Sequence, residues 1–152
     1  MRPEVTADVA AALSAGRPVV VLESTIFSNL GLPSPANSDA LRRCSSAVRD
    51  AGAVPAITAV LDGVVRLGLH PDEEERILGD ARKVAERDLA VAVAQRWRVG
   101  ATTVSASVAV AAAAGASVFA TGGIGGVHRG SEITGDVSAD LDALASHPVV
   151  TV

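Results

Sequence analysis

Short apolar runs alternate with helix-like segments along most of the chain. Uninterrupted apolar runs are typical of strands that are buried on both faces of a sheet. The sequence predicts such strands over residues 18–22, 54–61, 118–121 and 148–152. A return strand over residues 64–67 follows Asp62-Gly63, a pair that favours a two-residue hairpin turn.

The segments between these runs carry helix signals. Helices are expected over residues 38–51, 71–78 and 102–114, and residues 136–144 contain a further helix start. The first has Asn37 or Ser38 as its N-cap and Gly52 as its stop. Residues 89–96 fit a strand or a helix, because periodicity alone does not distinguish the two.

Apolar strands separated by helices predict an α/β fold with a mainly parallel sheet flanked by helices. No internal repeat or linker divides the sequence, so residues 1–152 are expected to form a single α/β domain. Ligands of such folds bind beyond the carboxyl ends of the strands. Glu23, the loop after Thr121 and the segment around Asp136 all fall at such ends.

The composition excludes several function classes. The formal net charge is -4 with interleaved signs, which does not fit a basic surface for nucleic acid, and an aromatic content of 2% gives no base-stacking platform. The longest apolar stretch, residues 104–120, is interrupted by serines and a glycine, so no membrane span is expected. No signal peptide is recognised, and the single cysteine, Cys44, is expected to be a small core residue of a cytoplasmic protein.

Glu23 directly follows the apolar run over residues 18–22. A carboxyl group at the carboxyl end of a strand can act as a general acid or base where the cleft removes water from it. From residue type alone, the alternative is a solvated loop acid.

Residues 121–130 read TGGIGGVHRG and contain five glycines. Glycine lets backbone amides approach a ligand closely, and such amides suit a phosphate, with His128 and Arg129 as further donors. The spacing differs from the dinucleotide-binding and P-loop patterns. A tight structural turn is therefore the alternative.

An acidic cluster follows, with Asp136, Asp140 and Asp142 within seven residues. If the segment is helical, Asp136 and Asp140 lie one turn apart on the same face. Carboxylate oxygens of this kind suit magnesium or manganese. The alternative is a helix N-terminus that carries acidic residues for its dipole.

Lys83 is the only lysine among 13 basic residues. A primary amine can form a Schiff base or bind phosphate as a compact charge, and arginine cannot replace it in the first role. The alternative is a coding bias toward arginine that has left one lysine in place.

Several short motifs occur in a characteristic order. They are Glu23-Ser24-Thr25-Ile26, Gly52-Ala53-Val54-Pro55-Ala56, Leu61-Asp62-Gly63, Lys83-Val84, Arg87-Asp88-Leu89, Gly100-Ala101-Thr102-Thr103-Val104, the TGGIGGVHRG run and Ser138-Ala139-Asp140-Leu141. In combination, over residues 16–152, they resemble the pseudouridine-5′-phosphate glycosidase family. The resemblance implies an α/β fold, a homotrimer, a divalent metal that is typically Mn²⁺, and a phosphosugar substrate. It also implies reversible cleavage of the C–C glycosidic bond of pseudouridine 5′-phosphate to uracil and ribose 5-phosphate.

The resemblance further implies roles for individual positions. Glu23 matches the proton donor, Lys83 a substrate ligand, Val104, Ser138, Ala139 and Asp140 substrate contacts, and Asp136 the metal ligand. A carbon leaving group is poor, so opening of the ribose to an imine on lysine would provide an electron sink.

The sequence departs from the family pattern at three places. Ser28-Asn29-Leu30-Gly31 stands where Ser-His-Gly is usual, Gly135 replaces a bulky residue, and Ala85-Glu86 replaces a serine and a basic residue. The first two changes bear on the pocket for the base. They leave open, as an alternative, a C-glycosynthase that joins ribose 5-phosphate to an aromatic natural-product acceptor.

The family's nucleophilic lysine lies a few residues beyond the segment 148–150, past the last residue of this chain. The chain is therefore expected to be the N-terminal half of the family's catalytic domain, inactive alone and with an exposed apolar face. A non-catalytic fragment that binds a phosphosugar is the third alternative.

Overall fold

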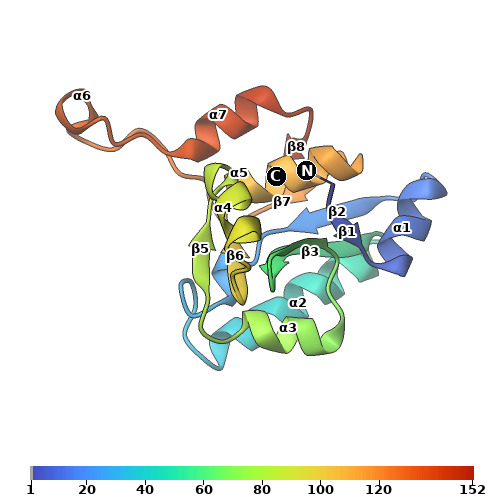
Figure 1. Cartoon of the computed structure of the whole chain (residues 1–152). Coiled ribbons are helices and arrows are strands. Elements are labelled where there is room, and N and C mark those ends of the chain that lie inside the picture. Colours follow the sequence, from blue (N-terminus) through green and yellow to red (C-terminus); the bar gives the residue numbers. More distant parts are fainter. Residues whose placement is uncertain (1) are drawn as a thin grey trace.

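The computed structural model describes residues 2–152 and shows a sheet between two layers of helices (Figure 1). The strands are β1 (Glu4–Val5), β2 (Val19–Leu22), β3 (Val54–Leu61), β4 (Val64–Leu67), β5 (Arg82–Val84), β6 (Val99–Thr102), β7 (Val118–Ala120) and β8 (Val150–Thr151). The α-helices are α1 (Ala7–Ser14), α2 (Ala36–Asp50), α3 (Pro71–Ile77), α4 (Leu89–Ala94), α5 (Val104–Ala114), α6 (Ser131–Thr134) and α7 (Ala139–Ser146). Short 3-10 helices, η1 (Thr25–Phe27) and η2 (Glu86–Asp88), follow β2 and β5.

The sheet has the order β1-β4-β3-β2-β7-β8, and β6 pairs with β3 and β5. The pairs β1·β4, β2·β3, β2·β7, β7·β8 and β5·β6 are parallel, whereas β3 runs antiparallel to β4 and β6. The predicted α/β fold with a mainly parallel sheet is therefore confirmed. Asp62 and Gly63 join β3 to β4 with φ angles of 51° and 80°, as a type I′ hairpin turn requires.

The long strand β3 is apolar because both of its faces are covered. Ala56 and Val60 pack into a cluster with α1, α4 and α5, and Ile57, Ala59 and Leu61 pack into a second cluster with α2 and α3. A strand between two helical layers has no solvent-facing side, so the alternation of polar and apolar residues disappears.

Several predicted bounds shift in the structure. Helix α2 begins at Ala36 with Pro35 as its N-cap, so the expected caps Asn37 and Ser38 lie inside the helix. The Asn37 amide instead donates to the carbonyls of Phe27 and Leu78, at 3.0 Å each. Residues 89–94 are helical, which resolves the ambiguity there. Strands β5 and β6 were not expected.

Cys44 is exposed on α2, so its predicted place in the core is wrong. It lies beside Ser45 on a helix whose buried residues are Asn37, Leu41 and Ser45. An exposed thiol without a second cysteine has no intramolecular disulfide partner.

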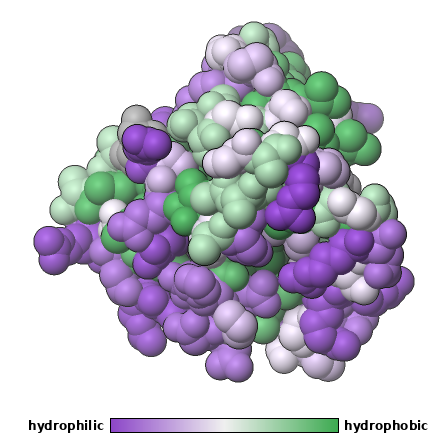
Figure 2. Space-filling model, turned by 90° about the vertical axis from the view of Figure 1, so that its right-hand side faces the viewer, coloured by the Kyte–Doolittle hydropathy of each residue, from purple (hydrophilic) through white to green (hydrophobic). Residues whose placement is uncertain are grey.

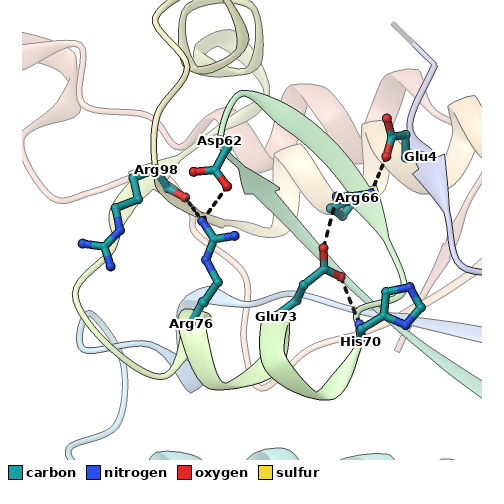
Figure 3. Close-up of polar contacts among 7 residues, drawn as sticks. All are labelled: Glu4, Asp62, Arg66, His70, Glu73, Arg76 and Arg98. Atoms are coloured by element: carbon teal, nitrogen blue, oxygen red, sulfur yellow. Dashed lines mark hydrogen bonds and ion pairs between the residues drawn. The ribbon is translucent and has the colours of Figure 1, made fainter.

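A set of ion pairs ties α3 to the β3–β4 hairpin and to β1 (Figure 3). Arg66 of β4 contacts Glu4 of β1, and it lies 3.2 Å from Glu73 of α3. Arg76 of α3 lies 2.9 Å from Asp62 in the hairpin turn. Partly exposed pairs of this kind each contribute about 0.2–1 kcal/mol, so they fix orientation more than they stabilise the fold.

Apolar side chains also reach the surface. The loop that contains α6 projects away from the body of the molecule (Figure 1), and Ile124, Val127, Ile133 and Val137 are exposed along it. Viewed from the right-hand side of Figure 1, hydrophilic residues cover most of the lower half, and hydrophobic and neutral residues gather in the upper half (Figure 2). Among residues 2–152, no helix is both long enough and apolar enough to cross a membrane.

Candidate active site

A cavity of about 500 Å³ lies where four strand ends meet. Strands β2 and β6 pair with successive halves of one edge of β3 and run toward each other, so their carboxyl ends converge beside Thr58. Strand β7 accompanies β2 and strand β5 accompanies β6, both in parallel. The segments that follow these four strands therefore surround one space, as expected for a ligand site in an α/β fold.

Buried hydroxyl groups hold the two converging ends together. Ser24 Oγ accepts a hydrogen bond from the Thr102 backbone N–H at 2.9 Å. Thr58 Oγ1 lies 2.8 Å from both Thr102 Oγ1 and Ser107 Oγ. The Thr25 hydroxyl donates to the Thr102 carbonyl at 2.8 Å. These bonds fix the backbone on the carboxyl side of Glu23, and each contributes about 1 kcal/mol to stability.

Glu23 is a buried acid at the wall of the cavity, with 8% of its surface exposed. Burial raises the pKa of Glu23 above its usual value, and the nearby charge of Asp140 adds to this. A hydrogen bond from the Thr121 hydroxyl to Glu23 Oε1 and the charge of Lys83 act in the opposite direction on this pKa. The structure thus shows a desolvated carboxyl group and not a solvated loop acid.

Asp140 joins three elements at the same wall. Its Oδ1 accepts from the Ser105 backbone N–H in α5, and its Oδ2 accepts from the Gly125 N–H, at 2.9 Å each. Its own N–H donates to Ser138 Oγ at 3.2 Å, which caps α7. Both carboxylate oxygens are therefore engaged by backbone amides, and this buried side chain holds the cavity wall together.

The helix start predicted within residues 136–144 is found at Ala139, where α7 begins. Asp136 precedes it in an extended segment whose neighbour Val137 forms a bridge with Val127. Asp136 and Asp140 therefore do not share a helical face. The side chain of Asp136 lies 3.2 Å from His128 Nδ1 across this bridge.

Close packing accounts for one glycine of the 121–130 run. A Cβ on Gly125 would lie 2.1 Å from Ser138 Oγ and 3.0 Å from Asp140 Oδ2, which no side chain permits. A Cβ on Gly123 or Gly126 would meet nothing within 4 Å. The structural-turn interpretation thus holds at Gly125, where the backbone must approach the Asp140 carboxylate.

The cavity brings together most residues predicted to form the site. Its lining includes Glu23, Lys83, Val104, His128, Asp136, Ser138, Ala139 and Asp140. Arg129 is not part of the lining, so its predicted contact with substrate has no support in this arrangement.

Arg87 lines the same cavity and was recognised in the sequence only as part of a motif. Neither Lys83 nor Arg87 forms an ion pair with another residue of the described chain. The spacing of the two cations, four residues apart, is the signal that could have identified Arg87.

The side chains of the cavity offer few ligands for a metal ion. Within residues 2–152, no group of three or more histidine, cysteine, aspartate or glutamate side chains is placed to hold a metal ion. Asp136 and His128 together offer two donors. Ions such as Mg²⁺ keep several waters and take one or two carboxylates plus substrate phosphate, so this donor set fits a water-rich site.

Residues 8–152 match the family model described as Indigoidine synthase A like protein. The chain belongs to this family. Curated relatives named pseudouridine-5'-phosphate glycosidase include the protein of Rhodospirillum centenum, 54% identical over 146 residues, which are 95% of this chain and 45% of that protein. The relative in Mesorhizobium japonicum is 50% identical over 151 residues, covering 98% of this chain and 49% of that protein. The resemblance inferred from the motifs is thereby confirmed.

Solved structures of the family show the same fold. The prealnumycin C-glycosynthase AlnA, in complex with ribulose 5-phosphate, superposes with a TM-score of 0.88 at 37% identity, covering 100% of this chain and 49% of that chain. An indigoidine synthase A-like protein from Thermotoga maritima gives a TM-score of 0.79 at 35% identity, covering 88% and 44%. The chain spans about half the length of the curated relatives it matches.

Proposed function

We propose that the chain acts in the reversible cleavage of the C–C glycosidic bond of pseudouridine 5′-phosphate to uracil and ribose 5-phosphate. The observation that carries this proposal is Glu23, a buried acid with a raised pKa that shares a cavity with Lys83 and Arg87, two cations that form no ion pair within residues 2–152. The curated relatives of that name, at about half identity, support it.

The chemistry needs a proton donor with the properties of Glu23. When the C–C bond breaks, its electron pair goes to a carbon atom of the uracil ring, and that carbon must take up a proton. A carboxyl group donates effectively when burial keeps its pKa close to the working pH. Glu23 has such an environment, and in the synthetic direction its carboxylate takes the same proton back.

The cations of the cavity suit a phosphosugar. Lys83 lies in β5 and Arg87 in η2, which follows it, and both line the cavity together with Val104, the first residue of α5. Lysine binds phosphate as a compact charge, and its amine can also form an imine with an opened sugar. The AlnA complex contains a five-carbon sugar phosphate, which supports a ligand of this class here.

We also propose that Asp136, with His128 beside it, helps to hold a divalent metal, Mn²⁺. Such an ion would orient water and polar groups near the base. Asp136→Ala should abolish Mn²⁺ binding measured by electron paramagnetic resonance. Mn²⁺ binding by the variant at wild-type affinity would contradict the assignment. A homotrimer and a cytoplasmic location complete the proposal, and light scattering checks the first.

The C-glycosynthase alternative has one structural argument against it. The segment 28–31 and Gly135, where the sequence departs from the family, do not line the cavity. Asn29 lies in the segment where the family usually has a histidine. Its side chain donates to Asp80 at 3.0 Å and accepts from the Ala81 N–H at 3.1 Å. The two departures that bear on the base pocket therefore lie outside the lining, which favours the pseudouridine reaction, whereas Ala85 of the third departure does line the cavity.

Substrate assays separate the candidate functions. Incubation of the chain, extended to the full length of its curated relatives, with pseudouridine 5′-phosphate should release uracil, and Glu23→Gln should abolish the release. C-ribosylation of aromatic acceptors without uracil release would instead support the glycosynthase. Calorimetric binding of ribose 5-phosphate without turnover would support a phosphosugar-binding role, and no binding of either phosphorylated ligand would contradict all three.

A further inference from the structure

Thr121 lies between Glu23 and the glycine segment 122–126, directly after β7. Its Oγ1 donates to Glu23 Oε1, lies 3.0 Å from the Gly123 carbonyl oxygen, and accepts from the Gly123 N–H at 3.2 Å. Its backbone N–H is fixed by the Val152 carbonyl at 3.0 Å. One hydroxyl proton therefore has two acceptors within reach, the Glu23 carboxylate and the Gly123 carbonyl.

The protonation state of Glu23 decides between these acceptors. A hydroxyl has one proton to donate and two lone pairs to accept with, and an ionised carboxylate only accepts. When Glu23 is ionised, Thr121 donates to Oε1. When Glu23 is protonated, it donates to Thr121 Oγ1, and the hydroxyl proton of Thr121 turns to the Gly123 carbonyl. In both states, Oγ1 still accepts from the Gly123 N–H.

We propose that Thr121 is a positioning residue that keeps Glu23 hydrogen-bonded in both protonation states and couples its proton to the Gly123 peptide. This deepens the proposed function, because the exchange would hold the proton donor in place before and after it gives up its proton. The exchange itself is a property of the chain without substrate. It can therefore be tested separately from the reaction.

Other charged groups around Glu23 act through space. Asp140 and Lys83 face Glu23 from α7 and β5 with opposite charges. Arg87 and Asp88 from η2, and His128 and Asp136 from the loop before α7, complete the charged and titratable lining of the cavity. Within residues 2–152, the Thr121 hydroxyl is the single side-chain group that is hydrogen-bonded to the Glu23 carboxyl. Loss of this hydroxyl should destabilise the ionised form most, since a buried carboxylate needs donors.

A purely structural threonine is the alternative. Its hydroxyl would close the turn at Gly123, and its loss would lower the free energy of unfolding without changing how Glu23 titrates. Thr121→Val removes the hydroxyl and keeps the shape, whereas Thr121→Ser keeps the hydroxyl. Thr103→Val is a matched control, because Thr103 lines the same cavity and its hydroxyl bonds to Ser105, at 3.0 Å.

The test is a pH titration of the chain followed by NMR. The ¹³Cδ resonance of Glu23, assigned by its loss in Glu23→Gln, reports the carboxyl group, and the ¹H–¹⁵N resonance of Gly123 reports the loop. In the wild type, both should titrate with one midpoint. Thr121→Val should move the Glu23 midpoint to higher pH and remove the matching titration of Gly123. Thr121→Ser should restore both, and Thr103→Val should change neither.

Three results would overturn the inference: a Gly123 amide that does not follow Glu23 in the wild type, a wild-type midpoint in Thr121→Val, or no rescue by Thr121→Ser. The first needs no Thr121 variant, so the test stands even if Thr121→Val does not fold. Absence of uracil release or phosphosugar binding would contradict the proposed function alone, because this titration contains no substrate.

Discussion

Asp140→Asn tests how the cavity wall is held together. In the wild type, the carboxylate accepts one hydrogen bond from α5 and one from the glycine segment, both at 2.9 Å. An asparagine has the same shape but offers one acceptor oxygen and one NH₂ group. Whichever way it turns, one of the two backbone N–H groups of Ser105 and Gly125 faces a donor. The substitution thus removes one hydrogen bond and opposes two donors.

The size of the effect follows from these contacts. A hydrogen bond to a charged acceptor contributes about 1.5–3 kcal/mol, and a buried donor left without a partner costs about 1–3 kcal/mol. Asp140 is 9% exposed, so little water replaces the lost partner. The free energy of unfolding should therefore fall by about 2–4 kcal/mol, measured by urea denaturation.

Asp142→Asn is the matched control. Asp142 lies in the same first turn of α7, is exposed, and makes no hydrogen bond or ion pair through its side chain in the described chain. Its loss removes only a favourable interaction with the helix dipole, about 0.3–1 kcal/mol. Equal urea midpoints for the two variants would refute the idea that Asp140 clamps the wall. Asp140→Asn should also move the Glu23 titration to lower pH, because the charge of Asp140 raises the pKa of Glu23.

Other substitutions test neighbouring features. Because the pKa of Glu23 is raised above the usual 4.5, the folded chain binds more protons than the unfolded chain, and its stability falls as pH rises from that value toward the folded pKa. Glu23→Gln should remove this loss. In urea titrations, the stability of the variant relative to the wild type should therefore be higher at pH 7 than at pH 4. Gly125→Ala should destabilise the chain by about 1–3 kcal/mol through its collision with Ser138, whereas Gly126→Ala should have little effect, and equal thermal midpoints would contradict this. Lys83→Arg should weaken ribose 5-phosphate binding about tenfold in calorimetry, since the longer planar group does not replace a compact ammonium, and an unchanged Kd would reject Lys83 as a ligand.

The strands that the sequence predicts correctly are those with an uninterrupted apolar pattern. Strand β3 is found because both of its faces are buried, and its hairpin with β4 is found because Asp62-Gly63 is a strong local turn signal. Strands β5 and β6 lack such signals. The first reads RKV and the second VGAT, and both are strands because of their pairing with each other and, for β6, with β3. Pairing between distant segments overrides weak local propensity.

The same distinction applies to the candidate site. Glu23 and the segment 138–140 could be placed at strand ends from the sequence, and the cavity does bring them together. The meeting of β2 and β6 end to end along β3 could not be foreseen, because it depends on the register of two pairings. Arg129 lies in the turn that follows His128, in which the Ser131 N–H donates to the His128 carbonyl at 3.1 Å, whereas the His128 N–H donates to the Asp136 carbonyl next to the 127–137 bridge. His128 therefore reaches Asp136 and the cavity, and its neighbour Arg129 does not.

The composition of the glycine segment indicates a phosphate site, but two of its backbone amides bind side chains of the protein instead. An anion site made of backbone amides needs N–H groups that are free to point at the ligand. The Gly125 N–H is engaged by Asp140 and the Gly123 N–H by Thr121, at 2.9 and 3.2 Å. A phosphate placed against these two amides would also approach two carboxyl groups. One is Asp140, which accepts from the Gly125 N–H, and the other is Glu23, which accepts from the Thr121 hydroxyl. Lys83 in β5 and Arg87 in η2 instead form no ion pair within the described chain, and both line the cavity. In the proposed function, Lys83 and Arg87 would therefore hold the anionic end of the phosphosugar, and its glycosidic carbon would face Glu23, the proposed proton donor.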